Sequence, residues 1–524
     1  AITGALPERP GEGLFRAPSP SLLDLRLRLA ELARDRYVSG VLLKITGAPG
    51  SFSQAQELAA SIDHMRARGK RVHVYLEEAG NRSVFVAAHG DRVILNPATL
   101  LNMLGIHLVW RFYRDTLAAV GVEAQVVRFE EYKAAADPWI QSGSREVVRD
   151  AARDMMDATF DQLVGDIAAL RGRPREEVEA WVDNSPMAPE RARAAGVVDD
   201  IAGREGLEAI IRDHEGRPPR LVRSYPSPRA QDLRWGPPPR VAVVVLEGLM
   251  ITGPSRSVPF LGLRFSGADT VASALDAAAA DPSVGAILLR IQSPGGMALA
   301  AELVNRKVAE AAKKKPLAAS IASAAASGGY YAAAAAPRIF VMPGSVTGSI
   351  GVVYGKPVIS GLLDLLKVKR EHMLRGRHAD IECLDRRLSD LEMEHVRGEL
   401  ESLYRLFRER VAEGRKLAPE RVHELARGRV WLGAEALRNG LADQEGGVLE
   451  ALDWLLERMG ARPGQRPELI YLPRGTLMGA VLREAGLAAA PGLSLDELAE
   501  LVFLVARPGL WMLDLSFVDD IFRS

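Results

Sequence analysis

Cysteine is nearly absent from this chain, and neither sign of charge is in excess. Among 524 residues there is a single cysteine, Cys383, which excludes an internal disulfide and any metal site with several cysteine ligands. The 67 basic residues equal the 67 acidic residues in number. Because a nucleic-acid-binding protein needs a basic excess to neutralise phosphates, this balance argues against a nucleic-acid partner.

Long apolar runs are missing as well. No stretch of about 18 uncharged apolar residues is present, so the sequence predicts no obvious membrane span. Residues 498–515 come nearest, but Glu500, Arg507 and Pro508 interrupt them. We predict a buried helix and turn there, with membrane contact as the alternative. The sequence opens on Ala1 without a signal segment, and we expect the natural chain to start upstream, where an anchor remains possible.

The chain repeats itself. Residues 35–50 (DRYVSGVLLKITGAPG) resemble residues 281–296 (DPSVGAILLRIQSPGG), which lie 246 positions later. A later pair, residues 191–200 and 435–444, is related by an offset of 244. Chance does not sustain such a register over this distance. The sequence therefore predicts a tandem duplication of a domain of roughly 200 residues.

Apolar runs alternate with helical patterns in the second copy. Buried strands are expected at 241–246, 286–291, 317–322 and 338–342, and helices at 269–280 and 298–314. This alternation predicts an α/β fold with parallel strands and crossover helices. We expect four parts: a first repeat (1–213), a linker rich in proline and arginine (214–239), a second repeat (240–462), and a tail (463–524) that serves assembly or membrane contact.

Two glycine-rich segments of the second copy are candidates for chemistry. Residues 293–296 (SPGG) follow a strand, and residues 327–330 (SGGY) precede an alanine-rich helix. Glycines leave backbone N–H groups uncovered, and a helix N-terminus adds the positive end of its dipole. Together the segments would form an oxyanion hole beside a serine nucleophile. From these residues alone, a tight turn and a helix-capping serine explain the pattern at least as well.

A family resemblance decides between these interpretations. Residues 323–352 (SAAASGGYYAAAAAPRIFVMPGSVTGSIGV), together with the SPGG turn, resemble the signal peptide peptidase A (protease IV) family. The resemblance implies a serine peptidase of the ClpP/crotonase-like fold, whose long members are tandem duplications. It assigns the nucleophile to Ser327 and the oxyanion-hole N–H groups to Gly296 and Gly328. It also implies a lysine base from the first copy, matched by Lys133 in residues 131–139 (EYKAAADPW), and a serine that orients this lysine, matched by Ser349.

The duplication supplies an argument that does not depend on the family. At the offset of 246, the positions equivalent to the nucleophile, the base and the orienting serine hold unrelated side chains, namely Asn81, Ala379 and Met103. Each copy thus keeps half of a Ser–Lys dyad, which predicts one composite site between the copies. Burial of Lys133 in an apolar interface would lower its pKa enough for it to accept a proton. The nine histidines are scattered and match no catalytic motif.

We therefore expect a Ser–Lys peptidase, and the resemblance implies that it degrades signal-peptide remnants and other short apolar peptides. The resemblance further implies a homo-oligomer, with a tetramer favoured because long members are usually tetrameric, associated with the extracytoplasmic face of the bacterial inner membrane. No cofactor and no metal are expected, because the sequence has neither a phosphate loop nor a clustered ligand set. Two alternatives stay open: a crotonase-like acyl-CoA enzyme, which would need neither Lys133 nor Ser327, and a catalytically inactive scaffold that binds membrane peptides.

Overall fold

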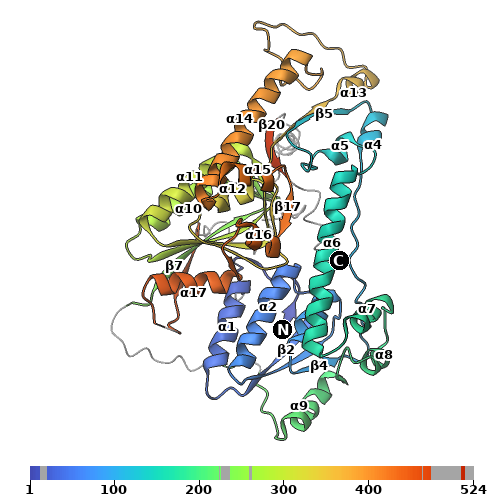
Figure 1. Ribbon diagram of the computed structural model, residues 1–524, viewed down its shortest axis with the longest axis vertical. Helices are drawn as coiled ribbons and strands as arrows, with labels where there is room; N and C mark the ends of the chain where they lie inside the picture. The colour runs from blue at the N-terminus through green and yellow to red at the C-terminus, as the bar shows by residue number, and fades with distance from the viewer. Residues whose placement is uncertain are drawn as a thin grey trace.

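Two α/β repeats follow one another along the chain (Figure 1). The computed structural model describes residues 1–11, 20–222, 225, 237–258, 263–462 and 464–473, and it describes residues 509–513 as backbone. The first repeat is coloured from blue to green and the second from yellow-green to orange. Half of the predicted linker lies outside the described residues.

The sheet of the first repeat has the strand order β1-β2-β3-β4-β6, and every neighbouring pair is parallel. Parallel pairing requires crossovers, which the helices between the strands supply. The strands are β1 (Ile2–Thr3), β2 (Gly40–Gly47), β3 (Arg71–Leu76), β4 (Arg92–Leu95) and β6 (Asp200–Ile201), and the helices among them include α1 (Leu22–Arg34), α2 (Phe52–Ala67) and α3 (Asn81–Ala88). Ser21 starts α1 in a capping box with Asp24.

The second repeat builds a larger sheet in the order β17-β15-β13-β11-β7-β19, and β14 pairs with β13 and, on its other side, with β18. Its strands are β7 (Arg240–Glu247), β11 (Ala286–Ser293), β13 (Leu317–Ala326), β14 (Ile339–Val341), β15 (Val346–Gly348), β17 (Val430–Leu432), β18 (Gln444–Glu445) and β19 (Glu468–Leu472). Its helices include α10 (Ala268–Ala280), α11 (Ala298–Lys314), α12 (Gly328–Ala334) and α17 (Val448–Arg458). The strands and helices predicted for this copy are confirmed.

Several equivalent elements of the two repeats have equal lengths. Helices α1 and α10 are both 13 residues long and begin 246 positions apart, and strands β2 and β11 share the same offset and are both 8 residues long. The long helices α6 (Glu146–Arg171) and α14 (Asp390–Arg415) are both 26 residues long and begin 244 positions apart. The tandem duplication is therefore visible in the fold, including the loss of two residues between these points.

Strand β7 shows how the two repeats share a core. Its side chains alternate between opposite faces of the sheet, as the pleat requires. Ala242, Val244 and Leu246 pack with α10, α11 and α12. On the other face, the intervening valines pack with α17 and with Leu23 and Ala30 of helix α1. A helix of the first repeat thus covers part of the sheet of the second repeat.

A buried ionic network also joins the repeats. Glu57 of α2 accepts hydrogen bonds from Arg26 of α1 (2.9 Å) and from Arg290 of β11 (2.6 Å). Glu8 accepts a further bond from Arg290 Nε (2.7 Å). Burial alone would lower the pKa of the Arg290 guanidinium, but the attraction of Glu57 and Glu8 outweighs it and raises that pKa above its usual value.

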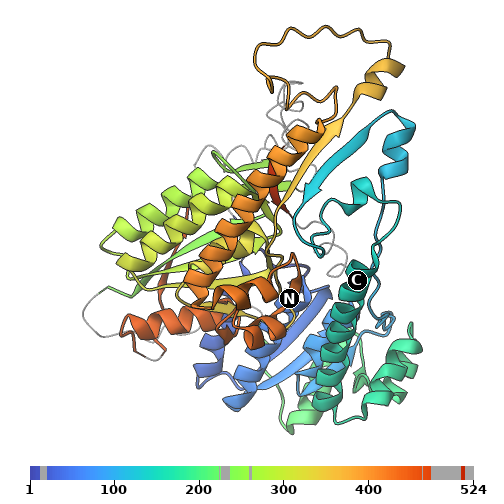
Figure 2. The same cartoon turned by 45° about the horizontal axis from the view of Figure 1, so that its top comes forward.

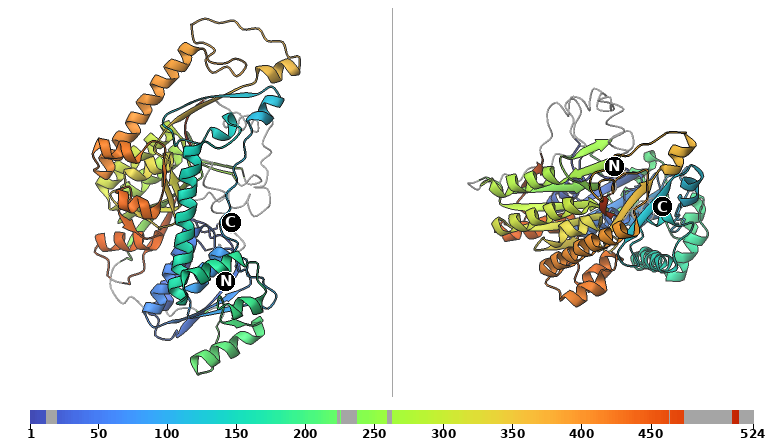
Figure 3. Two further views of the ribbon diagram at one scale, coloured as in Figure 1. Left: turned by 45° about the vertical axis from the view of Figure 1, so that its right-hand side comes forward. Right: turned by 90° about the horizontal axis from the view of Figure 1, so that it is seen from above.

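Strands from both repeats also pair directly in an arm at one end of the molecule. β5 (Glu123–Arg128) of the first repeat runs antiparallel to β16 (Val353–Val358) of the second, and Figure 2 shows them side by side beside helix α14. Their sheet continues from β16 through β20 (Gly509–Leu513) and β12 (Gly295–Met297) to β8 (Leu249–Ile251), β10 (Leu263–Gly267) and β9 (Arg256–Val258). Helix α6 runs from the body of the first repeat to this arm (Figure 3). The arm therefore carries first-repeat residues to the second repeat.

Short helices complete the repeats: α4 (Arg114–Ala119), α5 (Asp137–Ile140), α7 (Arg175–Asp183), α8 (Pro189–Ala194), η1 (Arg204–Gly206), α9 (Leu207–Glu215), α13 (Ser360–Leu365), α15 (Pro419–Leu425) and α16 (Gly433–Asn439). Within the predicted tail, strand β19 pairs parallel to β7 and extends the second sheet. The apolar run at 498–515 lies outside the described residues except for β20. In the part of the chain that the structure describes, no helix is both long and apolar enough to cross a membrane.

Candidate active site

Ser327 occupies a strained turn between strand β13 and helix α12. Its φ of 53° and ψ of −115° are uncommon for a residue with a side chain. Its backbone is fixed on both sides, since its N–H donates to Gly348 (2.8 Å) and its carbonyl accepts from Tyr331 (2.8 Å). Strain of this kind is held only where the surrounding structure demands it, and it concentrates at functional sites.

Two buried tyrosines anchor the helix that begins after Ser327. The Tyr330 hydroxyl donates to the carbonyl of Leu441 (2.9 Å), and the Tyr331 hydroxyl donates to Glu302 of α11 (2.7 Å). Burial raises the pKa of both phenols above the usual value, so they remain hydrogen-bond donors at neutral pH. The N-terminus of α12 is therefore held in a fixed position.

Lys133 of the first repeat reaches Ser327 of the second. Its Nζ lies 2.8 Å from Ser327 Oγ, 3.0 Å from Ser349 Oγ and 3.1 Å from the Ser349 carbonyl oxygen. All three residues are 0% exposed. The structure thus brings together the three side chains that the sequence singled out, from segments 194 and 216 residues apart.

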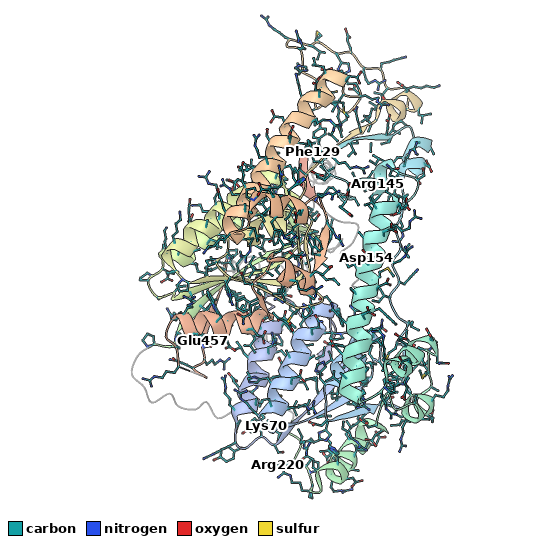
Figure 4. All side chains as sticks on the ribbon, viewed as in Figure 1. Lys70, Phe129, Arg145, Asp154, Arg220 and Glu457 are labelled. Atoms are coloured by element: carbon teal, nitrogen blue, oxygen red, sulfur yellow. The ribbon has the colours of Figure 1, made fainter. Side chains whose placement is uncertain are left out.

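A carboxylate and two arginines hold the segment that carries Lys133. Asp137 is paired with Arg128 at the end of β5 and with Arg145 at the start of α6, the latter at 2.8 Å. Arg145 also donates to the carbonyls of Glu131 and Lys133. Figure 4 labels Arg145 at the arm end of helix α6. These contacts fix the backbone on both sides of the lysine.

The second repeat closes the other side of the lysine. Gly428 has a φ of +77°, and a Cβ built on it would lie 2.6 Å from the backbone nitrogen of Lys133. The neighbouring carbonyl of Arg427 accepts from the N–H of Tyr132 (3.1 Å). Only glycine permits this close approach, so the loop of the second repeat packs directly on the lysine backbone.

The glycines predicted for an oxyanion hole are adjacent. Gly296 has a φ of +155°, and a Cβ there would lie 2.1 Å from the carbonyl oxygen of Met250. A Cβ built on Gly328 would lie 3.2 Å from the nitrogen of Gly296. As the first residue of α12, Gly328 has an N–H that no carbonyl of its own helix accepts. Two backbone N–H groups therefore lie close together beside Ser327.

Ser293 shapes the turn that carries Gly296. Its hydroxyl donates to the carbonyl of Gly248 (2.7 Å) and accepts from the N–H of Gly295 (3.2 Å).

The positioning roles of Ser293, Asp137 and Arg145 were missed at the level of sequence. Ser293 belongs to the SPGG segment and Asp137 to the EYKAAADPW segment. Their place in these two motifs was the sequence signal that could have identified them. Nothing in the sequence pointed to Arg145.

The equivalent positions of the first repeat are built differently. Asn81 begins helix α3 with an ordinary backbone and donates to the carbonyl of Gly105 (2.6 Å). Met103 is fully buried in the apolar core of the first repeat. Ala379, the equivalent of Lys133, is exposed on the arm. Ser327, Lys133 and Ser349 therefore come together at one site, which lies between the two repeats.

One group of potential metal ligands lies outside this site, on the arm. Among the residues that the structure describes, His372, Cys383 and Asp385 bring ligand atoms within 4.8 Å of one another. Asp385 accepts from Cys383 (2.5 Å) and contacts His372 (2.9 Å), so the three side chains satisfy one another without an ion. The candidate active site does not include them.

Comparisons with known proteins agree with this architecture. The chain is 26% identical to a serine protease, "SPPA, chloroplastic", of Arabidopsis thaliana over 87% of this chain and 68% of the relative. It is 26% identical to "Protease 4" of Haemophilus influenzae over 86% of this chain and 74% of the relative. A putative signal peptide peptidase SppA of Enterococcus faecium is 35% identical over 33% of this chain and 51% of the relative.

Solved structures and a family model complete the comparison. The membrane-bound stomatin-specific protease 1510-N matches with a TM-score of 0.29 and 14% identity, over 47% of this chain and 98% of that chain. ClpP1 of Listeria monocytogenes matches with a TM-score of 0.26 and 15% identity, over 40% of this chain and 94% of that chain. The model of peptidase family S49 matches residues 64–215 and 309–462, one segment in each repeat and together more than half of the chain. The chain therefore belongs to peptidase family S49, with a copy of the family's domain in each half.

Proposed function

We propose that this protein is a serine endopeptidase whose nucleophile is Ser327 and whose general base is Lys133. The observation that carries the proposal is the 2.8 Å contact between Lys133 Nζ and Ser327 Oγ inside a fully buried pair. A serine hydroxyl is a weak nucleophile that needs a base within hydrogen-bond reach. Burial penalises the charged form of an amine, so a buried lysine gives up its proton more readily than an exposed one.

The reaction follows from this geometry. Neutral Lys133 takes the proton of the Ser327 hydroxyl while Oγ attacks the scissile carbonyl carbon. The resulting ammonium gives that proton to the departing amine, and an acyl-enzyme on Ser327 remains. Water then attacks the acyl carbon with Lys133 again as base, and the peptide acid leaves as Ser327 regains its proton.

Two further groups support these steps. The N–H groups of Gly296 and Gly328 would stabilise the negative charge on the carbonyl oxygen, since preorganised backbone donors act strongly in a site without water. The Ser349 hydroxyl and carbonyl, at 3.0 and 3.1 Å from Nζ, direct the amine toward Ser327. Ser349 is therefore a positioning residue.

The proposed substrates are short apolar peptides, including the remnants of cleaved signal peptides. The supporting observation is the similarity to the relative from Enterococcus faecium that carries the name of a putative signal peptide peptidase. We also propose that the protein works at the extracytoplasmic face of the bacterial inner membrane and assembles with copies of itself. The family resemblance supports these substrates, this location and this assembly, whereas the contact between Lys133 and Ser327 supports the Ser–Lys dyad as well.

Labelling and hydrolysis together test the proposal. The full chain is treated with a fluorophosphonate, which phosphonylates activated serines with loss of fluoride, and the modified residue is mapped by mass spectrometry. We expect labelling of Ser327 at a rate that rises with pH, because only the neutral amine accepts a proton. Hydrolysis of a fluorogenic apolar peptide should fall at least about 10³-fold in Ser327→Ala. The exposed Ser283→Ala is the matched control and should retain activity.

Three outcomes would contradict the proposal. If the Ser327→Ala variant still hydrolyses peptides, Ser327 is not the nucleophile. A chain that binds apolar peptides but neither hydrolyses them nor reacts with the fluorophosphonate would be the catalytically inactive scaffold. Turnover of acyl-CoA thioesters that is insensitive to Ser327→Ala and Lys133→Ala would indicate the crotonase-like alternative.

A further inference from the structure

Strand β20 fills a slot beside the candidate active site. It is hydrogen-bonded between β12 and β16 and runs antiparallel to both. In this register Met512 lies opposite Gly296 of β12, and Leu510 lies opposite Tyr354 of β16. A segment from the far C-terminal part of the chain is therefore aligned with the predicted oxyanion-hole glycine.

Both walls of this slot belong to the site. Strand β12 contains Gly296, and strand β16 begins four residues after Ser349. On its other side, β16 pairs with β5, which ends five residues before Lys133. An extended peptide whose scissile bond reaches Ser327 would have to pass along these same walls.

The slot is one strand wide. Neighbouring strands lie about 4.8 Å apart, so β12 and β16 would face each other across roughly 10 Å if β20 were absent. Each would then present a row of unpaired N–H and C=O groups. Two facing strand edges of this kind bind an extended chain by β-augmentation, in which backbone hydrogen bonds supply affinity with little dependence on sequence.

We propose that residues 509–513 are an intramolecular occupant of the substrate groove, which a peptide substrate must displace before it can be cleaved. The proposal rests on the proposed peptidase function, because it regulates that same site. The segment reads GLWML and carries no charge, which matches the apolar peptides proposed as substrates. Because it belongs to the same chain, its effective concentration at the groove is high, and modest backbone pairing suffices to close the site.

A binding experiment tests the occupant without catalysis. The full-length Ser327→Ala chain is prepared with Met512→Pro and, as the matched control, with Met512→Ala. Proline removes a backbone N–H and is excluded from the middle of a paired strand, whereas alanine keeps the backbone intact. The probe is a fluorescein-labelled synthetic peptide with the sequence of residues 507–515, followed by fluorescence anisotropy. We expect the proline variant to bind it at least about tenfold more tightly than the alanine control.

Equal affinity in the two variants, or binding by neither, overturns the proposal. Deletion of residues 509–524 is the second variant, and it should reproduce the gain in affinity with an unchanged far-ultraviolet circular dichroism spectrum. The bound peptide should also protect Ser327 from the fluorophosphonate in a chain that carries Met512→Pro and an intact Ser327. Unprotected Ser327 would show that the peptide binds elsewhere and would overturn the proposal.

Catalysis is measured separately, so that the two proposals fail in different ways. With Ser327 intact, Met512→Pro should lower the KM for a fluorogenic apolar peptide at least about tenfold relative to Met512→Ala and leave kcat unchanged, because an internal competitor raises only KM. Equal KM values together with Ser327-dependent hydrolysis overturn the occupant and leave the peptidase. Absence of hydrolysis in every variant refutes the peptidase, and the anisotropy result still decides whether β20 is displaceable.

Discussion

Lys133 and Ser327 are 194 residues apart in the chain, yet Nζ of the first lies 2.8 Å from Oγ of the second. Each residue stands in a different copy of the duplicated domain, and neither copy holds the other's partner at the equivalent position. The contact depends on β5 of the first repeat crossing to pair with β16 of the second. Changes in either repeat should therefore affect one shared activity.

The first prediction concerns this pair. Lys133→Ala should lower kcat/KM for peptide hydrolysis nearly as much as Ser327→Ala, by at least about 10³-fold, and the double variant should be little worse, because the two groups act as a unit. Lys133→Arg should fail as well, since a guanidinium stays protonated and cannot accept the serine proton. The control is Lys307→Ala, which removes a partly exposed lysine of helix α11. Independent, multiplicative losses in a double-mutant cycle would contradict the dyad.

The second prediction concerns Ser349, which lies 3.0 Å from the lysine amine through its hydroxyl. Ser349→Ala removes this hydrogen bond but keeps the carbonyl contact at 3.1 Å. A hydrogen bond to a charged or proton-accepting group contributes about 1.5–3 kcal/mol, so kcat should fall about 10- to 100-fold with little change in KM. The pH profile of kcat/KM should shift as well, because the lysine loses a neighbour. An unchanged profile with a lowered unfolding temperature would show a purely structural role.

Much of this architecture is predictable from the sequence, because it depends on local patterns. The offset of 246 residues marks the duplication, and runs such as 241–246 and 286–291 identify the parallel strands by their apolar character. The pairing of β5 with β16 is not predictable in this way, since both strands are short and their partners lie far away in sequence. Arg145 was missed for the same reason: it acts through Asp137 and two backbone carbonyls, contacts that only the folded chain defines.

The third prediction concerns the ionic network between the repeats. Glu57→Gln replaces the carboxylate that both Arg26 and Arg290 contact, and all three side chains are buried. Without the negative charge of Glu57, the two buried guanidinium groups have one carboxylate fewer to balance their positive charges. The free energy of unfolding should therefore fall by about 3–5 kcal/mol. Glu179→Gln, which breaks an exposed pair with Arg175 on helix α7, should have a much smaller effect on the free energy of unfolding, because water screens the pair. Denaturant titration measures both, and equal losses would show that the network does not hold the repeats together.

The last prediction concerns the pH dependence of stability through Glu450, which lies in the first turn of helix α17 and accepts two hydrogen bonds from Arg26. Burial by itself would raise the pKa of the Glu450 carboxyl, but the attraction and hydrogen bonds of Arg26 outweigh it, and the pKa lies below its usual value. A carboxyl whose pKa is lowered by folding stabilises the folded state above its unfolded pKa, near 4.3, and this contribution is lost as the pH falls through the folded value.

The difference in unfolding temperature between the wild-type chain and Glu450→Gln should therefore be largest at pH 7 and should decrease as the pH falls below about 4. Because 34% of the side chain is exposed, water screens the pair and the difference should be modest. Glu457→Gln is the matched control, since Glu457 lies exposed on the same helix (Figure 4). A difference for Glu450→Gln that is constant from pH 7 to pH 3 would show that lost packing, rather than the charge of the carboxylate, causes the destabilisation.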